Sequence, residues 1–193
     1  LVDLGKKLRQ VHSFTFKVRG FFLPNLYIES KFYRGVCSGY FDYIIASLTS
    51  ALVCERLGKE LAKNTLEYIR SKDASFLALN GQCHLVHSDF NTKNILVCLK
   101  TKKVNAILDW EFAHSGTPLV DFANLLRFEN ESPVDVQSFL REGYGKEDEL
   151  FQDDWRQTCS LLDIASMCGF LTREVLQPRT MKTAKEVIQR IMN

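Results

Sequence analysis

A mostly polar octet separates two short apolar runs in the stretch Leu85-Val-His-Ser-Asp-Phe-Asn-Thr-Lys-Asn-Ile-Leu-Val97. Runs rich in Val, Ile and Leu favour β-strands, whereas Ser, Asp and Asn favour turns. The stretch therefore predicts a strand, a tight loop and a second strand. Because the loop carries a His, an Asp and several amide and hydroxyl groups, we regard it as a candidate functional site.

Two carboxylates and an amide are expected to gather near this loop. The runs 94–99 and 104–108 predict a β-hairpin, which brings Asn94 and Asp109 to the same open end. Asp89 stands at the mouth of the same loop. One or two carboxylates with an amide oxygen, completed by water and substrate phosphates, suit Mg²⁺. A carboxylate left free of the metal can orient a hydroxyl and accept its proton.

The order His87-x-Asp89-x-x-x-x-Asn94, followed by Asp109 at a strand end, is that of a kinase catalytic loop and its metal-binding Asp. The opening stretch, together with AILDWEFAHSGTPLVDFANLLRF at 106–128, resembles the family of aminoglycoside phosphotransferases, hygromycin phosphotransferases and choline kinases. Members typically show HGDxxxxNxLV, a DWE-like triplet and a Gly-x-Pro-x-x-Asp stretch. Each of Asp89, Asn94 and Asp109 taken alone is better explained as a turn or cap residue, and only their combination in this order favours a functional site.

The resemblance implies roles for individual residues. Asp89 resembles the catalytic carboxylate that faces the substrate hydroxyl, and Asn94 and Asp109 resemble the Mg²⁺ ligands that bridge to the ATP phosphates. Glu111, in the DxE form of the triplet, either adds a metal or water contact or is solvated in its loop. Asp121 resembles the buried acid that holds the backbone of the catalytic loop.

The resemblance is strong over 83–128, weaker over 1–13 and uninformative elsewhere. Ser88 stands where the family usually has Gly, and Asn91-Thr92-Lys93 replaces a common Pro- or Gly-containing insert. His87 is expected to brace the loop rather than react. The other three histidines receive no role, because isolated histidines are more often surface or satisfied core residues.

Apolar periodicity predicts that helices dominate on both sides of the short strands. The expected helices cover 2–12, 38–57, 59–70, 74–79, 117–126, 133–142, 148–169 and 179–192, and the expected strands cover 83–86, 94–99 and 104–108. With the resemblance, this predicts an α+β fold class: a mostly helical lobe like the C-terminal lobe of protein kinases. A small β-hairpin cluster carries the catalytic and metal loops.

We expect one lobe over 1–193, with 83–128 as its catalytic core and the helical regions 14–82 and 129–193 binding the acceptor. No Gly-rich loop or strand Lys of a nucleotide-binding lobe is visible, and the glycines at 35 and 39 lack a strand–turn–strand context. The N-terminal nucleotide-binding lobe is therefore expected to be absent from this chain. A missing N-terminal part of the protein, or a partner chain, would supply it.

Composition and charge limit the kinds of binding partner that the sequence suggests. The 193 residues are 46% hydrophobic, and the net charge of +2 comes from interspersed residues, which gives no case for nucleic acid or membrane as a partner. No apolar run reaches the roughly 18 residues of a membrane span. The six cysteines lack CxxC or metal-ligand spacing, which favours free thiols and a cytoplasmic location.

The favoured hypothesis is an ATP- or GTP-dependent, Mg²⁺-requiring phosphotransferase that acts on a hydroxyl of a small molecule. The acidic residues between 142 and 154 would suit a cationic acceptor such as an aminoglycoside, but a solvated helix end explains them equally well. Two alternatives stay open: a catalytically silent kinase-like binding module, and a metal-dependent phosphohydrolase using His87, Asp89 and Asp109. Whether this chain is active alone does not follow from its sequence.

Overall fold

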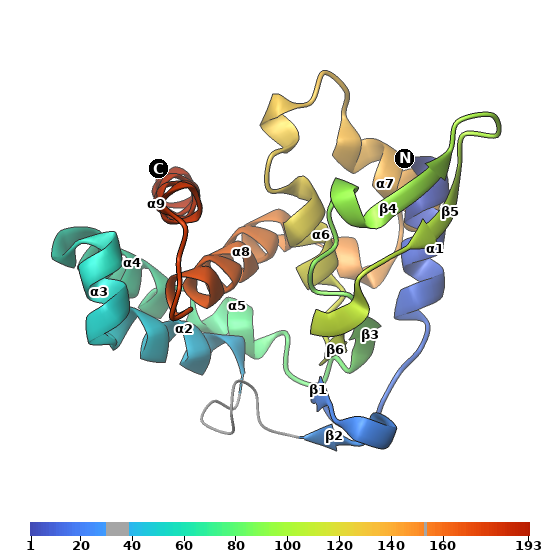
Figure 1. Ribbon diagram of the computed structural model, residues 1–193. Helices are drawn as coiled ribbons and strands as arrows, with labels where there is room; N and C mark the ends of the chain where they lie inside the picture. The colour runs from blue at the N-terminus through green and yellow to red at the C-terminus, as the bar shows by residue number, and fades with distance from the viewer. Residues whose placement is uncertain (30–38, 153) are drawn as a thin grey trace. The chain divides into compact units, whose positions relative to one another are not determined.

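The computed structural model describes residues 1–29, 39–152 and 154–193 and divides the chain into two compact units (Figure 1). The first unit comprises Leu1–Ser30 and Gly81–Arg156, and the second comprises Lys31–Asn80 and Gln157–Asn193. The expectation for Gly35 and the start of the helix expected from Ser38 lie outside the described residues. All of the residues expected to carry chemistry fall in the first unit.

Within its described residues, the first unit combines two small antiparallel sheets with the helices α1, α6 and α7. The four-stranded sheet has the order β2-β1-β6-β3, and the two-stranded sheet is the β4-β5 hairpin. The bounds are α1 Val2–His12, β1 Gly20–Phe22, β2 Ile28–Glu29, β3 His84–Val86, β4 Ile95–Cys98, β5 Lys103–Ile107, β6 His114–Gly116, α6 Leu119–Leu126 and α7 Val136–Tyr144. Single 3-10 turns lie between them at Pro24–Leu26, Thr92–Asn94, Trp110–Phe112, Glu129–Glu131 and Glu149–Phe151.

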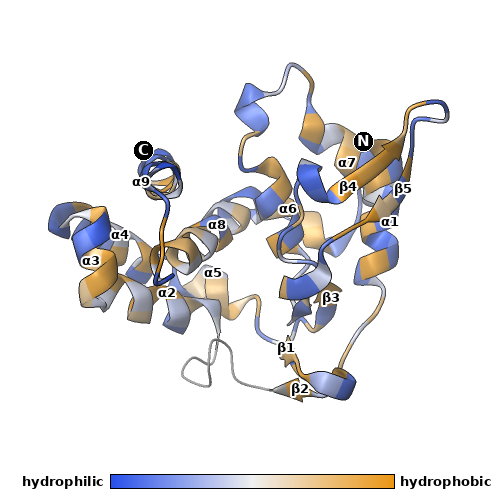
Figure 2. Cartoon of the chain, in the orientation of Figure 1, coloured by the Kyte–Doolittle hydropathy of each residue, from blue (hydrophilic) through white to orange (hydrophobic). Residues whose placement is uncertain are grey.

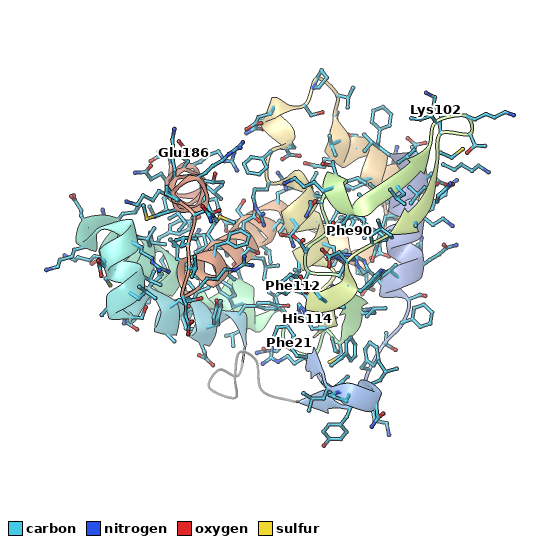
Figure 3. All side chains as sticks on the ribbon, in the orientation of Figure 1. Phe21, Phe90, Lys102, Phe112, His114 and Glu186 are labelled. Carbon is cyan, nitrogen blue, oxygen red and sulfur yellow. The ribbon has the colours of Figure 1, made fainter. Side chains whose placement is uncertain are left out.

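The predicted hairpin is present, with Ile95 opposite Ile107 and a bulge between Leu96 and Val97. Its apolar strands and its hydrophilic turn are distinct in Figure 2, and Lys102 lies at the tip in Figure 3. The backbone N–H of Leu108 donates to the carbonyl of Asn94 over 2.8 Å, which extends the pairing to the residue before Asp109. The open end of the hairpin therefore joins the loop that carries Asp89 to the turn that carries Asp109.

The strand expected at 83–86 is present as β3 and lies in the four-stranded sheet rather than beside the hairpin. As β3, it pairs with β6, and β6 pairs in turn with β1. The strands β1, β2 and β6 were not expected, because each has only two or three residues and β6 contains Ser and Gly. Such short segments acquire strand geometry from their partners rather than from a local pattern.

Helices α1 and α7 cross with backbone in direct contact. A Cβ atom on Gly5 would overlap the carbonyl oxygen of Leu140, and one on Gly143 would overlap that of Val2. Neither carbonyl can swing aside as a side chain could. The pair of glycines therefore sets how closely these two helices approach, and the two helices also carry His12 and Tyr144 to the site described below.

Replacing Gly143 by alanine should destabilise the fold by about 1–3 kcal/mol, the usual cost of forcing atoms into a packed interior. Chemical denaturation of the two proteins measures the difference. Gly169→Ala is the matched control, because its Cβ would lie 3.4 Å from the Tyr43 hydroxyl, an ordinary contact. That helical substitution should be neutral or slightly stabilising. Equal stability of Gly143→Ala and the natural protein would contradict the tight crossing.

The second unit is helical within its described residues. Its helices are α2 Tyr40–Thr49, α3 Ala51–Leu57, α4 Lys59–Arg70, α5 Asp73–Leu77, nearly all of α8 Trp155–Leu171, and α9 Pro178–Met192. Its fully buried side chains include Ile44, Val53, Ile69 and Ile188. The one long helix expected over 38–57 is wrong: the chain breaks at Ser50, whose hydroxyl accepts the N–H of Val53 and caps α3.

Other helix boundaries shift by several residues. The helix expected from 148 begins at Trp155, and the one expected over 133–142 runs over Val136–Tyr144. Helix α6 begins at Leu119 with Pro118 as its N-cap, and the hydroxyl of Thr117 accepts the N–H of Leu119. Across the described ranges, no helix combines the length and apolar character needed to cross a bilayer.

Candidate active site

The polar loop of the opening stretch leaves β3 at Val86 and returns to the hairpin at Ile95. The Phe90 side chain is fully buried and anchors the loop from within (Figure 3). Asp89, the residue before it, is half-buried. Its two carboxylate oxygens accept one amide hydrogen bond each, from Asn91 and from Asn94, both over 3.0 Å. The loop therefore presents an oriented carboxylate at the surface of a rigid turn.

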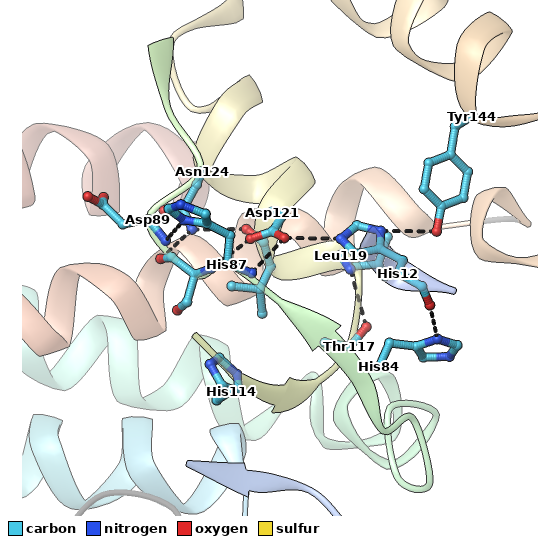
Figure 4. Close-up of polar contacts among 12 residues, drawn as sticks. His12, His84, His87, Asp89, His114, Thr117, Leu119, Asp121, Asn124 and Tyr144 are labelled. Carbon is cyan, nitrogen blue, oxygen red and sulfur yellow. Dashed lines mark hydrogen bonds and ion pairs between the residues drawn. The ribbon is translucent and has the colours of Figure 1, made fainter. Parts of the chain in front are cut away.

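Helix α6 holds this loop by its backbone, as was expected of Asp121. One oxygen of that buried carboxylate accepts the N–H of His87 over 2.9 Å, and the other accepts the N–H of Ser88 over 2.7 Å. Three residues along the helix, the amide of Asn124 donates to the carbonyl of Ser88 over 2.9 Å (Figure 4). Residues three apart share a helix face, so both side chains reach the backbone of the same residue, Ser88. The role of Asn124 was missed, although this spacing could have suggested it.

The Asp121 carboxylate also binds His12, a residue to which no role was assigned. The Nε2 atom of His12 lies 3.0 Å from Asp121, and its Nδ1 atom lies 3.1 Å from the hydroxyl of Tyr144 (Figure 4). Burial, reinforced by the charge of Asp148, raises the pKa of Tyr144. The phenol therefore keeps its proton and can donate it to Nδ1, which leaves Nε2–H to donate to the carboxylate. His84 supports the arrangement by donating to the His12 carbonyl over 2.7 Å.

His87 braces the loop against the end of β5, consistent with the expected role. Its Nδ1 atom accepts the N–H of Asp89, and its Nε2 atom lies 2.7 Å from the carbonyl of Leu108. A carbonyl can only accept and a backbone N–H can only donate, so the ring is in the neutral tautomer with hydrogen on Nε2. The indole of Trp110 packs on this ring at 4.7 Å between centroids. The His87 imidazole therefore contacts both the loop that carries Asp89 and the segment around Asp109.

Asn94 and Asp109 offer oxygen atoms suited to a hard divalent cation. Both hydrogens of the Asn94 amide are used on Asp89, at its carboxylate and its carbonyl, and the amide oxygen accepts no hydrogen bond from the described residues. Asp109 is exposed, adopts a left-handed backbone (φ 65°), and its carboxylate makes no hydrogen bond within the described residues. Mg²⁺ takes one or two protein carboxylates and completes its shell with water and phosphate oxygens, so this donor set fits it.

Glu111 lies exposed in the 3-10 turn after Asp109, and within the described residues no hydrogen bond or ion pair joins its side chain to Asn94 or Asp109. Within the ranges that the structure describes, no three His, Cys, Asp or Glu side chains form a group that could hold a metal ion. One of the acidic residues between 142 and 154 has partners within its own unit. The Asp148 carboxylate accepts the N–H of Leu150, and it lies 4.0 Å from the Arg9 guanidinium.

His114 lies in β6 and does not belong to the candidate site. Burial lowers the pKa of His114 to about 4, so its ring is neutral at physiological pH and packs against Phe21.

The five described cysteines are free thiols; Cys159 and Cys168 are buried, and burial raises the pKa of Cys168 to about 12. Of the phenylalanines near the N-terminus, Phe16 and Phe22 pack edge to face, whereas Phe14 is 64% exposed.

Ser88 occupies a left-handed backbone conformation, with φ at 68°, where an L-residue with a Cβ is strained. Replacing Ser88 by glycine should therefore raise the free energy of unfolding by about 1 kcal/mol. Thermal or chemical denaturation measures this gain. Ser88→Ala is the matched control, since it removes the hydroxyl but keeps the Cβ, and it should bring no gain. A glycine variant no more stable than the alanine variant would show that the strain is absent.

Comparison with solved structures places this fold among kinase-like phosphotransferases. A candidate fructosamine-3-kinase from Thermobifida fusca YX-ER1 superimposes with a TM-score of 0.65 at 16% identity, covering 98% of this chain and 64% of that one. A spectinomycin phosphotransferase, solved in complex with ADP and spectinomycin, gives a TM-score of 0.54 at 17% identity, covering 99% and 63%. At these identities the likeness shows the fold alone, and the chain spans less than two thirds of either structure.

Comparison of the sequence with protein families shows which family the chain belongs to. A model of the phosphotransferase enzyme family matches residues 1–160, and the chain therefore belongs to that family. Among curated proteins, the rat acyl-CoA dehydrogenase family member 11 is 47% identical over 49 residues, which are 25% of this chain and 6% of that protein. The family resemblance and the α+β, mostly helical kinase-like fold inferred from the sequence are both confirmed.

Proposed function

We propose that the chain is the catalytic lobe of an ATP- or GTP-dependent, Mg²⁺-requiring kinase that phosphorylates a hydroxyl group of a small molecule. The observation that carries the proposal is the carboxylate of Asp89, held by an amide on each oxygen, together with the oxygen atoms of Asn94 and Asp109, which make no hydrogen bond within the described residues. Membership of the phosphotransferase enzyme family supports it, as do relatives solved with ADP or AMP-PNP.

In the proposed reaction, Asp89 orients the acceptor hydroxyl and receives its proton. The acceptor oxygen forms a bond to the γ-phosphorus, and the bond from phosphorus to the bridging oxygen breaks with its electron pair leaving on the diphosphate. Asn94 and Asp109 would hold Mg²⁺, which supplies charge neutralisation on the phosphates when bound. Glu111 would add a metal or water contact. His87 and Asp121 keep the loop in place and do not touch the reacting atoms.

The proposed acceptor is a small molecule, because relatives of this fold have been solved with spectinomycin or hygromycin B. An aminoglycoside and another alcohol are both compatible with the site. We also propose that the groups that enclose the nucleotide come from a further N-terminal portion of the protein or from a partner chain, since the chain spans 63% or less of the nucleotide-bound relatives.

The test is nucleotide consumption by the full-length protein against a panel of aminoglycosides, amino alcohols and sugars, with Mg²⁺ or with EDTA. We expect acceptor-dependent ADP or GDP formation that EDTA abolishes. Nucleotide binding without transfer to any acceptor would favour the silent binding module. Phosphate release from phosphomonoesters without nucleotide would favour the phosphohydrolase, and either result would refute the kinase.

A further inference from the structure

Asn91 lies in the candidate catalytic loop but outside the family pattern, and its side chain makes three hydrogen bonds. Its Nδ2 atom donates to the carboxylate Oδ1 and to the carbonyl oxygen of Asp89, both over 3.0 Å. Its Oδ1 atom accepts the backbone N–H of Lys93, also over 3.0 Å. Because the carboxylate and the carbonyl can only accept and the N–H can only donate, these partners fix which end of the amide is nitrogen.

Asn94 makes a matching pair of contacts on the opposite oxygen of Asp89. Its Nδ2 atom donates to the carboxylate Oδ2 over 3.0 Å and to the same carbonyl over 2.9 Å. The carboxylate torsion of an aspartate is intrinsically broad, so one contact alone would leave the group free to turn. One amide on each oxygen holds its plane. Each oxygen retains a second lone pair, so the carboxylate can still accept an acceptor hydroxyl.

We infer that Asn91 is a positioning residue for Asp89, which fixes the plane of that carboxylate against Asn94 and so aims it at the acceptor hydroxyl. The inference rests on the proposed function. Asn91 has two separable duties, because its amide oxygen caps the 3-10 turn Thr92–Asn94 while its amide nitrogen holds Asp89. A merely structural role would need only the cap.

Two substitutions separate these duties. Asn91→Ser keeps a side-chain oxygen able to cap the turn but loses both donations to Asp89. Asn91→Asp keeps the cap and the shape but turns the donor into a carboxylate that repels Asp89. Thr92→Ala is the matched control, since Thr92 is the exposed neighbour in the same turn and its side chain makes no hydrogen bond with the residues that the structure describes.

In the full-length protein, we expect Asn91→Ser to lower kcat about 10- to 100-fold, the scale of misplacing a reacting group by about 1 Å. Asn91→Asp should lower it further. The KM for nucleotide and the melting temperature should stay close to those of Thr92→Ala. A kcat for Asn91→Ser equal to that of the control would overturn the positioning role.

Crystal structures of the natural protein and of Asn91→Ser provide a readout that needs no activity. We expect the plane of the Asp89 carboxylate to rotate in the variant, because Asn94 alone then holds it. If that carboxylate keeps its place, the inference fails whatever the kinetics show. If the natural protein phosphorylates no acceptor, the proposed function fails instead, and the carboxylate position still decides what Asn91 does.

Discussion

Replacing Asp89 by alanine should lower kcat for phosphoryl transfer by roughly 10²- to 10⁴-fold, the usual contribution of a positioned general base. Asp89 is the carboxylate with lone pairs left for an acceptor hydroxyl after its two amide contacts are made. The KM for the nucleotide should change little, because the donor atoms proposed for the metal and the phosphates belong to Asn94 and Asp109. Steady-state kinetics at saturating acceptor and nucleotide measure both quantities.

The Asp89 variant should also remain folded. The side chain is only half-buried, and water can replace its oxygen atoms as partners of the two asparagine amides. Thermal denaturation beside Glu60→Ala, which removes an equal charge from an exposed position of α4, checks this. A folded Asp89→Ala protein with undiminished kcat would remove Asp89 from the reaction, and the proposed mechanism with it.

The sequence predicted those parts of the fold that depend on neighbours along the chain. The β4-β5 hairpin follows from two apolar runs and a short turn, and it correctly brought Asn94 to the strand end that leads to Asp109. The sheet that joins β1, β6 and β3 could not be found in this way, because each segment is too short to show a period. Periodicity also ran through Ser50, where a local cap ends one helix and starts another.

The candidate site shows the same limit. Asp89, Asn94 and Asp109 are recognisable because their spacing lies within one short region of sequence. His12 could not be recognised in this way, because its partner Asp121 is 109 positions away in the sequence. No pattern in the helix that carries His12 indicates that partner. Asn91 looked like a replaced insert, and only the hydrogen-bond directions of its amide show that it contacts Asp89. Long-range polar pairing has no periodic pattern to detect.

Replacing Asp121 by alanine should cost about 3–5 kcal/mol of stability, since it leaves the polar partners of a buried carboxylate unpaired. The backbone N–H groups of His87 and Ser88 and the Nε2 atom of His12 would all lose their acceptor in an interior that water does not reach. Chemical denaturation measures the loss, and kcat should fall as well because the catalytic loop loses its attachment to α6. Asp135→Ala, which removes an exposed cap from α7, is the charge-matched control and should cost far less.

A double-mutant cycle with His12 tests whether these groups act as one network. Once Asp121 is gone, His12 has already lost one partner, so removing it should cost less than it does in the natural protein. The interaction free energy between His12→Ala and Asp121→Ala should therefore fall within the 0.5–3 kcal/mol or so typical of residues in one buried hydrogen-bond network. Simple additivity of the two losses would mean that α1 supports the catalytic loop by packing alone. A clear coupling would mean that the N-terminal helix reaches the loop through its histidine.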